Sequence, residues 1–196
     1  MSTTPLAIDP RTSALLVMDY QTSIVDGLAA DRDALLARTA SLLGAARAAG
    51  MRVVYVVIGF RDGYPEVSAS NPIFGAIRGT GRFVDGSPGS EVHSAVAPAA
   101  GDVVVTKRRV SGFAGCDLEM VLRAGGITTL VLAGIATSGV VLSTVRQAAD
   151  LDFAMVIVED CCADRDAEVH RVLMEKVLAR QATVAKAEAA VAALTR

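Results

Sequence analysis

Short apolar runs alternate with helical segments along the whole chain, and this alternation constrains the fold more than any other feature. Residues 13–18 (SALLVM) have the pattern of a buried strand, and leucines and alanines at helical spacing follow over 31–49 until Gly50. We therefore predict a single domain over residues 1–196, an α/β fold with a three-layer α/β/α sandwich, Rossmann-like, around a mostly parallel sheet. Further strands are predicted over 51–58, 102–106, 128–133, 153–158 and 183–185, and further helices over 117–124, 139–149 and 167–178.

Two charged residues stand where apolar strands end. Asp19 follows the first predicted strand and Lys107 follows the third. Ligands of open parallel sheets bind beyond the carboxyl ends of the strands, so this carboxylate and this ammonium are a candidate proton-transfer pair. The alternative is that Asp19 caps the next helical segment and Lys107 only neutralises it, and the spacing leaves both interpretations open.

A turn of small residues, 134–139 (GIATSG), leads from the fourth strand into a helix. Its backbone N–H groups could bind an anion or a developing oxyanion, and this interpretation makes Ala136, Thr137, Ser138 and Gly139 candidate substrate-binding residues. The alternative is a tight turn in which Thr137 or Ser138 caps the helix. The turn has neither the GxGxxG spacing of dinucleotide sites nor the lysine of a P-loop, which argues against nucleotide chemistry.

A long excursion over 59–89 is rich in Gly, Pro, Ser and Asn, with one short helix predicted near 72–78. Loops of this length are usually functional. Arg61, Tyr64 and Glu66, with Arg82 further on, are candidates for selecting the substrate, and the arginines would bind an anion. The alternative is a rigid surface turn in which Arg61 pairs with Asp62 or Glu66 in solvent.

The composition limits the kinds of partner that the chain is expected to bind. The chain is 52% hydrophobic and 20% charged, with a mean hydropathy of +0.45. We therefore expect a homodimer or homotetramer, with the apolar segments 140–145 and 187–194 as candidate interfaces. The net charge of −2, without a basic stretch beyond Lys107-Arg108-Arg109, argues against nucleic acid. Residues 1–9 do not resemble a signal peptide and the apolar runs are far shorter than the ~20 residues of a membrane helix, so we predict a cytoplasmic protein without a membrane segment.

The three cysteines are Cys116, Cys161 and Cys162, with no CxxC spacing, and the only histidines are His93 and His170. We expect reduced thiols, no metal site and no cofactor. Each cysteine is either a displaced nucleophile or a small buried residue, and the sequence places no histidine base beside any of them, which favours the second interpretation.

Three segments together carry a resemblance to a known family: LLVMDYQ, VVVTKRRVSGF and LVLAGIATSGVVLST. Their order and spacing resemble the signature segments of the isochorismatase-like (cysteine hydrolase) superfamily, over nearly the whole chain. The resemblance implies a parallel sheet between helices, an aspartate and a lysine at Asp19 and Lys107, and a nucleophilic cysteine in the third segment. It also implies backbone N–H donors at Ala136 and Val140 and a non-proline cis peptide at Ile135-Ala136.

The chain departs from the family pattern at two places. Val140 stands where the resemblance puts the cysteine, and a valine cannot attack a carbonyl carbon. The segment 59–62 (GFRD) lacks the Asp-x-His pair of the metal-binding nicotinamidase branch. The resemblance therefore implies hydrolysis that needs no thiol, as in isochorismate cleavage, where a general acid protonates the vinyl ether and water follows.

The sequence leads to two main hypotheses. The first is a hydrolase of a small carboxylated or carbonyl substrate, with Asp19 as general acid or base and with Lys107 and the 134–140 turn holding the substrate. The second is a catalytically degenerate family member that serves as a small-molecule binding or scaffold protein. A third, thiol hydrolysis by a relocated cysteine, predicts inactivation by iodoacetamide.

Overall fold

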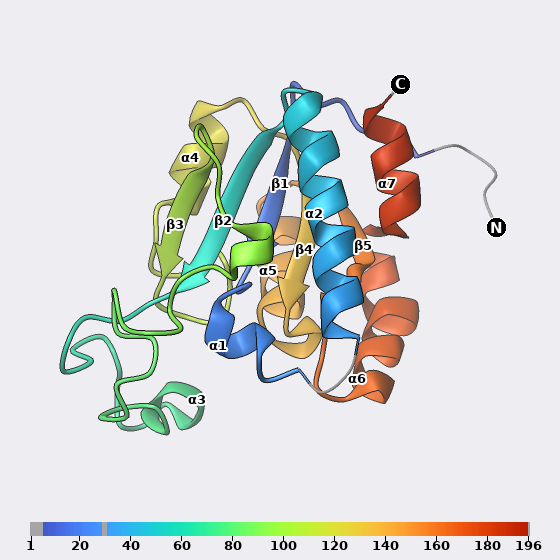
Figure 1. Cartoon of the computed structure of the whole chain (residues 1–196). Helices are drawn as coiled ribbons and strands as arrows, with labels where there is room; N and C mark the ends of the chain where they lie inside the picture. The colour runs from blue at the N-terminus through green and yellow to red at the C-terminus, as the bar shows by residue number, and fades with distance from the viewer. Residues whose placement is uncertain (1–5, 29–30, 196) are drawn as a thin grey trace.

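The computed structural model describes residues 6–28 and 31–195 and contains a six-stranded sheet in the order β3-β2-β1-β4-β5-β6 (Figure 1). All the strand pairings are parallel. The strands are β1 Ser13–Met18, β2 Arg52–Ile58, β3 Val103–Lys107, β4 Thr129–Ile135, β5 Ala154–Ala163 and β6 Thr183–Ala185. The helices are α1 Thr22–Val25, α2 Arg32–Ala48, α3 Pro72–Gly75, α4 Leu118–Ala124, α5 Leu142–Asp150, α6 Ala167–Val172 and α7 Ala187–Leu194.

Helices cover both faces of the sheet, which confirms the predicted α/β/α sandwich. Leu15 and Val17 of β1 pack in one apolar cluster with α2 and α7, whereas Leu16 and Met18 pack in the other with α4 and α5. These four side chains are fully buried. Burying one such side chain stabilises the fold by roughly 1.5–3 kcal/mol, so a strand buried on both faces anchors the whole sheet.

The strand order places a reversal of direction beside β1. The chain builds outward from β1 to β2 and β3, then returns to the other side of β1 to form β4. At such a reversal the connections after the two strands separate and leave a crevice at the carboxyl edge. Asp19 follows β1 and Thr137 follows β4, so both lie at this edge.

The long excursion between β2 and β3 forms a lobe with its own small core, which projects from the lower left of the molecule in Figure 1. Bridges join Phe60 to Val84 and Gln21 to Val92, and they tie the lobe to the strand ends. The short helix predicted near 72–78 is α3, capped by Asn71, whose side chain accepts hydrogen bonds from the backbone of Ile73 and Phe74.

Three predicted element boundaries were wrong. The fifth strand runs through to Ala163, so Cys161 and Cys162 lie within β5 and not after it. A register shift between Leu132 and Gly134 lets β5 keep pairing with β4 past the polar residues at 159–160 that predicted its end. The predicted helix 139–149 begins as a π-helical turn, Thr137–Val141, and the helix 167–178 changes after α6 into a second π-helical stretch, Leu173–Val177, and a short 3₁₀ helix, Leu178–Arg180.

Both segments expected at an oligomer interface bury apolar side chains within the chain itself. Val140, Val141 and Val145 are at most 2% exposed, and in α7 Ala187, Ala190 and Leu194 pack in the same cluster as α2. The homo-oligomer stays a prediction. Within residues 6–28 and 31–195, no helix has the length and apolarity to cross a bilayer. Residues 1–5 of the stretch predicted not to be a signal peptide lie outside the described residues.

Two glycine-to-alanine substitutions test the packing beside the carboxyl edge. A Cβ at Gly134 would lie 2.9 Å from Val141 Cγ2 and 3.1 Å from Met18 Cε, whereas a Cβ at Gly44 in α2 meets nothing within 4 Å. We expect Gly134→Ala to destabilise the fold by about 1–3 kcal/mol through overpacking. Gly44→Ala should stabilise it by about 0.5–1 kcal/mol through helix propensity. Urea unfolding of both variants measures this difference, and equal effects would contradict the packing of the turn.

Candidate active site

Asp19 and Lys107 form a buried ion pair. Lys107 Nζ lies 3.0 Å from Asp19 Oδ2, and the two side chains are only 2% and 9% exposed. The ammonium also donates to the backbone carbonyl of Arg109 at 3.1 Å. β2 separates β1 from β3 in the sheet, so the long lysine side chain is needed to reach Asp19 past the end of β2. The structure therefore brings together the two residues predicted from the strand ends.

The second oxygen of Asp19 is buried and has no hydrogen-bond partner among the described residues. Asp19 itself adopts a left-handed backbone conformation, with φ at 58°, and its N–H donates to Val56 O at 2.8 Å. Burial raises the pKa of the Asp19 carboxyl above its usual range, and the positive charge of Lys107 opposes part of that rise. A carboxyl with one anchored and one unpartnered oxygen has the geometry to exchange a proton with a ligand.

Gln21 holds the strand ends around this carboxylate in register. Its fully buried side chain accepts from the Ile58 N–H and donates to the carbonyls of Ile58 and Ser90. It thus joins the end of β1 to the end of β2 and to Ser90, where the lobe returns towards the sheet. In the sequence Gln21 comes soon after the first predicted strand, but only the strand order shows that β2 is its partner.

The turn after β4 has the cis peptide that the resemblance implied, at Ile135-Ala136. The π-helical turn Thr137–Val141 follows at once, and Val141 N–H donates to Ala136 O at 3.3 Å while Gly139 N–H donates to the same oxygen at 3.1 Å. Ser138 N–H donates to Asp164 Oδ2 at 2.7 Å. Neither Thr137 nor Ser138 caps a helix with its side chain, so the N-cap alternative was wrong.

Val140 is 2% exposed and belongs to the apolar cluster on the α4 and α5 face of the sheet. Val105 is in the same cluster, and Lys107, two residues further along β3, points to that same face because side chains alternate along a strand. The position where the resemblance puts a nucleophile therefore lies on the lysine's side of the sheet.

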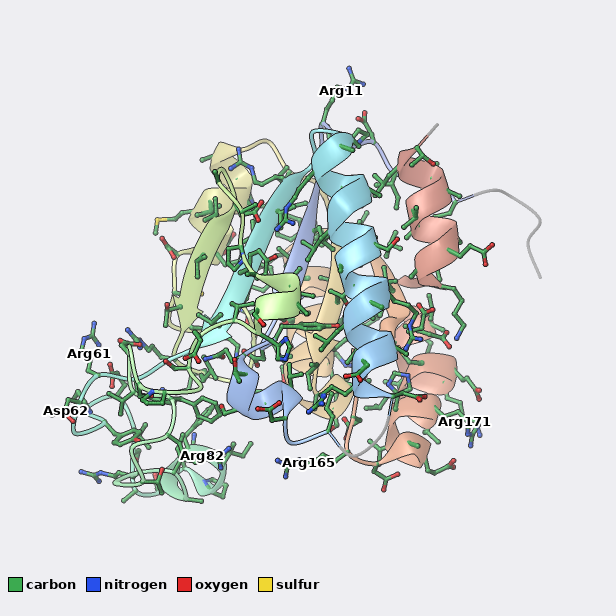
Figure 2. The ribbon with its side chains drawn as sticks, in the orientation of Figure 1. Arg11, Arg61, Asp62, Arg82, Arg165 and Arg171 are labelled. Atoms are coloured by element: carbon green, nitrogen blue, oxygen red, sulfur yellow. The ribbon has the colours of Figure 1, made fainter. Side chains whose placement is uncertain are left out.

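The three lobe residues predicted to select substrate contact each other and the rest of the lobe, and their role in substrate selection stays a prediction. Arg61 forms an ion pair with Glu66, and its side chain is 66% exposed. Tyr64 is buried in the lobe core and donates to the carbonyl of Arg82 at 2.9 Å. Figure 2 shows Arg61, Asp62 and Arg82 on the outer part of the lobe. Among the described residues, no hydrogen bond or ion pair joins Arg61, Tyr64 or Glu66 to Asp19 or Lys107.

The three cysteines are free thiols with raised pKa values. Burial raises the pKa of Cys116, raises that of Cys161 to about 11 and raises that of Cys162 furthest. Cys116 lies just before α4, where its Sγ contacts Gly112 O at 3.0 Å. A thiol with a raised pKa is almost entirely protonated at neutral pH and is a poor nucleophile. In the part of the chain that the structure describes, no group of three or more His, Cys, Asp and Glu side chains is placed to hold a metal ion.

Sequence reasoning missed two residues that contact the turn. His170 Nδ1 lies 2.7 Å from Thr137 Oγ1, and Asp164 accepts the Ser138 N–H. Both come from the end of β5 and from α6, far from the turn in the sequence. Their position after the fifth predicted strand was the one feature of the sequence that could have indicated a place in the site. A single histidine in a helix forms no sequence motif that would predict a role for it.

The comparisons with known proteins agree on one family. The sequence profile of the Isochorismatase domain matches residues 13–189. An uncharacterized isochorismatase family protein of Escherichia coli O157:H7, YecD, is 33% identical over 193 residues, covering 93% of this chain and 96% of its own. The ureidoacrylate amidohydrolase RutB of Methylobacterium radiotolerans is 32% identical over 195 residues, covering 88% and 76%.

A solved structure extends this agreement to the fold. The isochorismatase family protein of Burkholderia thailandensis superposes with a TM-score of 0.84 at 29% identity, covering 98% of this chain and all of that one. The profile match runs from β1 to the start of α7 and so includes Asp19, Lys107 and the turn after β4. On this evidence the chain belongs to the isochorismatase family.

Proposed function

We propose that the protein is a hydrolase of a small carboxylated or carbonyl substrate and that Asp19 transfers the proton without a cysteine nucleophile. The observation that carries this proposal is the state of the Asp19 carboxylate. One oxygen is held 3.0 Å from Lys107 Nζ, and the other is buried without a partner. An unpaired buried oxygen costs roughly 1–3 kcal/mol, a cost that a ligand proton in this position would offset.

On an amide-type carbonyl substrate, water is the nucleophile. Asp19 Oδ1 takes a proton from water while the water oxygen bonds to the carbonyl carbon. The carbonyl oxygen gains the electron pair and is stabilised by the N–H groups of Ala136 and Val140. When the bond to the leaving nitrogen breaks, Asp19 returns its proton to that nitrogen. The raised pKa of Asp19 makes the carboxylate a stronger base for the first step.

The same carboxyl can act first as an acid on a vinyl ether. It gives its proton to the ether's terminal carbon, water adds to the resulting cation, and the hemiketal separates into a ketone and an alcohol. A proton from the added water restores Asp19. The raised pKa serves this route too, because the carboxyl keeps its proton to a higher pH than an ordinary aspartate does.

Val140 occupies the position of the family nucleophile in this proposal. Its place in the turn after β4, on the face of the sheet to which Lys107 points, supports that assignment. The relative named as a ureidoacrylate amidohydrolase supports a small carboxylated substrate. Ureidoacrylate and isochorismate are therefore the first two compounds to assay, one for each of the two routes.

Alkylation separates this mechanism from one that uses a thiol. We expect iodoacetamide to leave turnover unchanged within about twofold, because Cys116, the one cysteine that is only partly buried, takes no part. The variant Val140→Cys is the positive control: alkylation there places a bulky group in the turn and should abolish turnover. Mass spectrometry counts the modified thiols, and turnover is measured before and after. Inactivation of the unmodified chain in step with alkylation of Cys116, Cys161 or Cys162 would contradict the proposal.

A binding or scaffold role is the second candidate, and the packing of Val140 favours it. A valine that is 2% exposed fills the turn with apolar contacts and offers no reacting group. This candidate predicts that ureidoacrylate or isochorismate binds to the chain without being turned over. Calorimetric binding together with product analysis distinguishes the two roles.

A further inference from the structure

We propose that His170 is a positioning residue that fixes the Thr137–Val141 turn for the reaction. The contact that carries this proposal is the 2.7 Å hydrogen bond between His170 Nδ1 and Thr137 Oγ1. Thr137 is fully buried and is the first residue of the turn. The inference rests on the proposed function, because it assigns that turn a role in binding the developing oxyanion.

A second bond holds the same turn from the same side. Asp164, between β5 and α6, accepts the N–H of Ser138 at 2.7 Å. α6 itself starts at a well-formed cap, because Asp166 accepts hydrogen bonds from the backbone of Glu168 and Val169. Two consecutive turn residues are thus tethered to one segment, 164–170, which lies beyond the end of β5. The orientation of the turn is therefore set by this segment as well as by β4.

The burial of His170 favours its neutral imidazole. Burial lowers the pKa of His170 below its usual range. The side chain lines a cavity of about 220 Å³ whose charged walls are Glu159 and Asp160 from β5, Lys186 before α7, Arg38 from α2 and Asp31, with Asp164 nearby. Lys186 is paired with Glu159 and Arg38 with Asp160, which leaves the imidazole without an ion-pair partner of its own among the described residues. A neutral imidazole has one donor and one acceptor nitrogen, so Nδ1 can bond the threonine hydroxyl in either sense.

His170 has a role in the geometry of the turn and not in proton transfer. His170 touches Thr137, and the proposed oxyanion donor is the N–H of Val140, three residues along the same turn. Displacing catalytic groups by about 1 Å can cost 10²-fold in rate. Loss of the His170 tether should therefore lower kcat and leave KM nearly unchanged, since the oxyanion that the turn is proposed to bind develops only in the transition state.

The decisive measurement does not depend on hydrolysis. In the Val140→Cys variant the new thiol reports on the turn: burial raises the pKa of a thiol at this position and aligned backbone N–H groups lower it, so the rate of alkylation at that one cysteine, followed by mass spectrometry, measures the alignment. We expect His170→Ala in this background to slow alkylation by iodoacetamide about tenfold, since misaligned N–H groups raise the thiol pKa by about one unit. Asparagine places a polar atom where Nδ1 was and glutamine does not. His170→Asn should therefore restore the rate and His170→Gln should not.

Two controls separate positioning from general loss of structure. Arg171, the next residue of α6, forms ion pairs with Glu168 and Glu175 and points away from the turn (Figure 2). Arg171→Ala should leave the alkylation rate unchanged although it weakens the same helix. Thr137→Val removes the hydroxyl while keeping the shape, so it should match His170→Ala, and the double substitution should slow the reaction no further.

A tenfold slower alkylation that asparagine rescues supports the positioning role, even if neither ureidoacrylate nor isochorismate is turned over, in which case only the hydrolase proposal fails. Equal alkylation rates with histidine, alanine and glutamine at position 170 would overturn the positioning role, whatever the turnover. Equal slowing by Arg171→Ala would also overturn it, because the effect would then belong to the stability of α6.

Discussion

Asp19→Asn is expected to lower kcat/KM by about 10²- to 10⁴-fold, the contribution of a positioned acid or base to a hydrolytic step. Asparagine keeps the shape of the side chain, and its amide oxygen can still accept from Lys107 Nζ at the position of Oδ2. What is lost is the ability of the second oxygen to carry a proton. The comparison of steady-state kinetics for the two proteins therefore isolates proton transfer.

A matched substitution controls for the removal of a negative charge. Asp33 lies in the first turn of α2 with its side chain 92% exposed, so Asp33→Asn should leave turnover unchanged and lower the stability only slightly, through its surface pair with Arg32 and its place at the helix N-terminus. Thermal unfolding shows whether Asp19→Asn is still folded. Turnover retained within about threefold in a folded Asp19→Asn protein would mean that another group moves the proton, and the mechanism proposed for this site would be wrong.

The pH dependence of turnover follows from the raised pKa of Asp19. On the vinyl-ether route Asp19 must start protonated, so kcat/KM should fall as the pH rises through its pKa. On the carbonyl route Asp19 must start ionised, so kcat/KM should fall as the pH is lowered through the same pKa. Whether kcat/KM falls on the alkaline or on the acidic side of that pKa therefore identifies the route.

Local patterns predicted the strands well and the site only in part. Residues 13–18 and 183–185 were predicted as strands with the bounds they have in the structure, because apolar runs end there at a charged residue or a turn. The pairing of Asp19 with Lys107 was predicted as a possibility, since both follow strands. Only the strand order shows that their strands flank β2 and lie close enough for a direct bond.

Local reasoning left the role of the lobe open and missed the tethers of the turn. Arg61 and Glu66 have charges that suit a ligand, yet they pair with each other five residues apart, and charge alone could not distinguish these outcomes. His170 and Asp164 contact residues 33 and 26 positions away, because α6 and the segment between β5 and α6 lie against the turn after β4. Such contacts depend on how each helix packs on the sheet. A hydrophobic pattern predicts which face of a helix is buried, but not which residues touch each other across the contact.

Lys107→Met should destabilise the fold by about 3–5 kcal/mol at neutral pH, because it leaves the Asp19 carboxylate buried without its counter-charge. Methionine matches the length of the lysine stem, so the loss reports the charge more than the packing. Urea unfolding at pH 7 measures the effect. The same variant should also lose turnover, since the ammonium that holds Asp19 Oδ2 is gone.

The pH dependence of that instability provides the sharper test. Burial raises the pKa of Asp19 in the native chain, and removing Lys107, the group that opposes this rise, must raise it further. The folded state then binds a proton that the unfolded state has released above its ordinary pKa of about 3.9, so stability falls as the pH rises from there through the folded pKa. Lys107→Met should therefore regain stability as the pH is lowered towards 5.

The double variant Asp19→Asn with Lys107→Met completes the argument. It removes both charges, so it should recover most of the stability lost by Lys107→Met alone, and the difference between the two variants should vanish as Asp19 becomes protonated at low pH. If the double variant were as unstable as Lys107→Met at every pH, the lysine stem would be stabilising the fold by packing and not by neutralising Asp19. The interpretation of this pair as a charge-balanced proton carrier would then lose its physical basis.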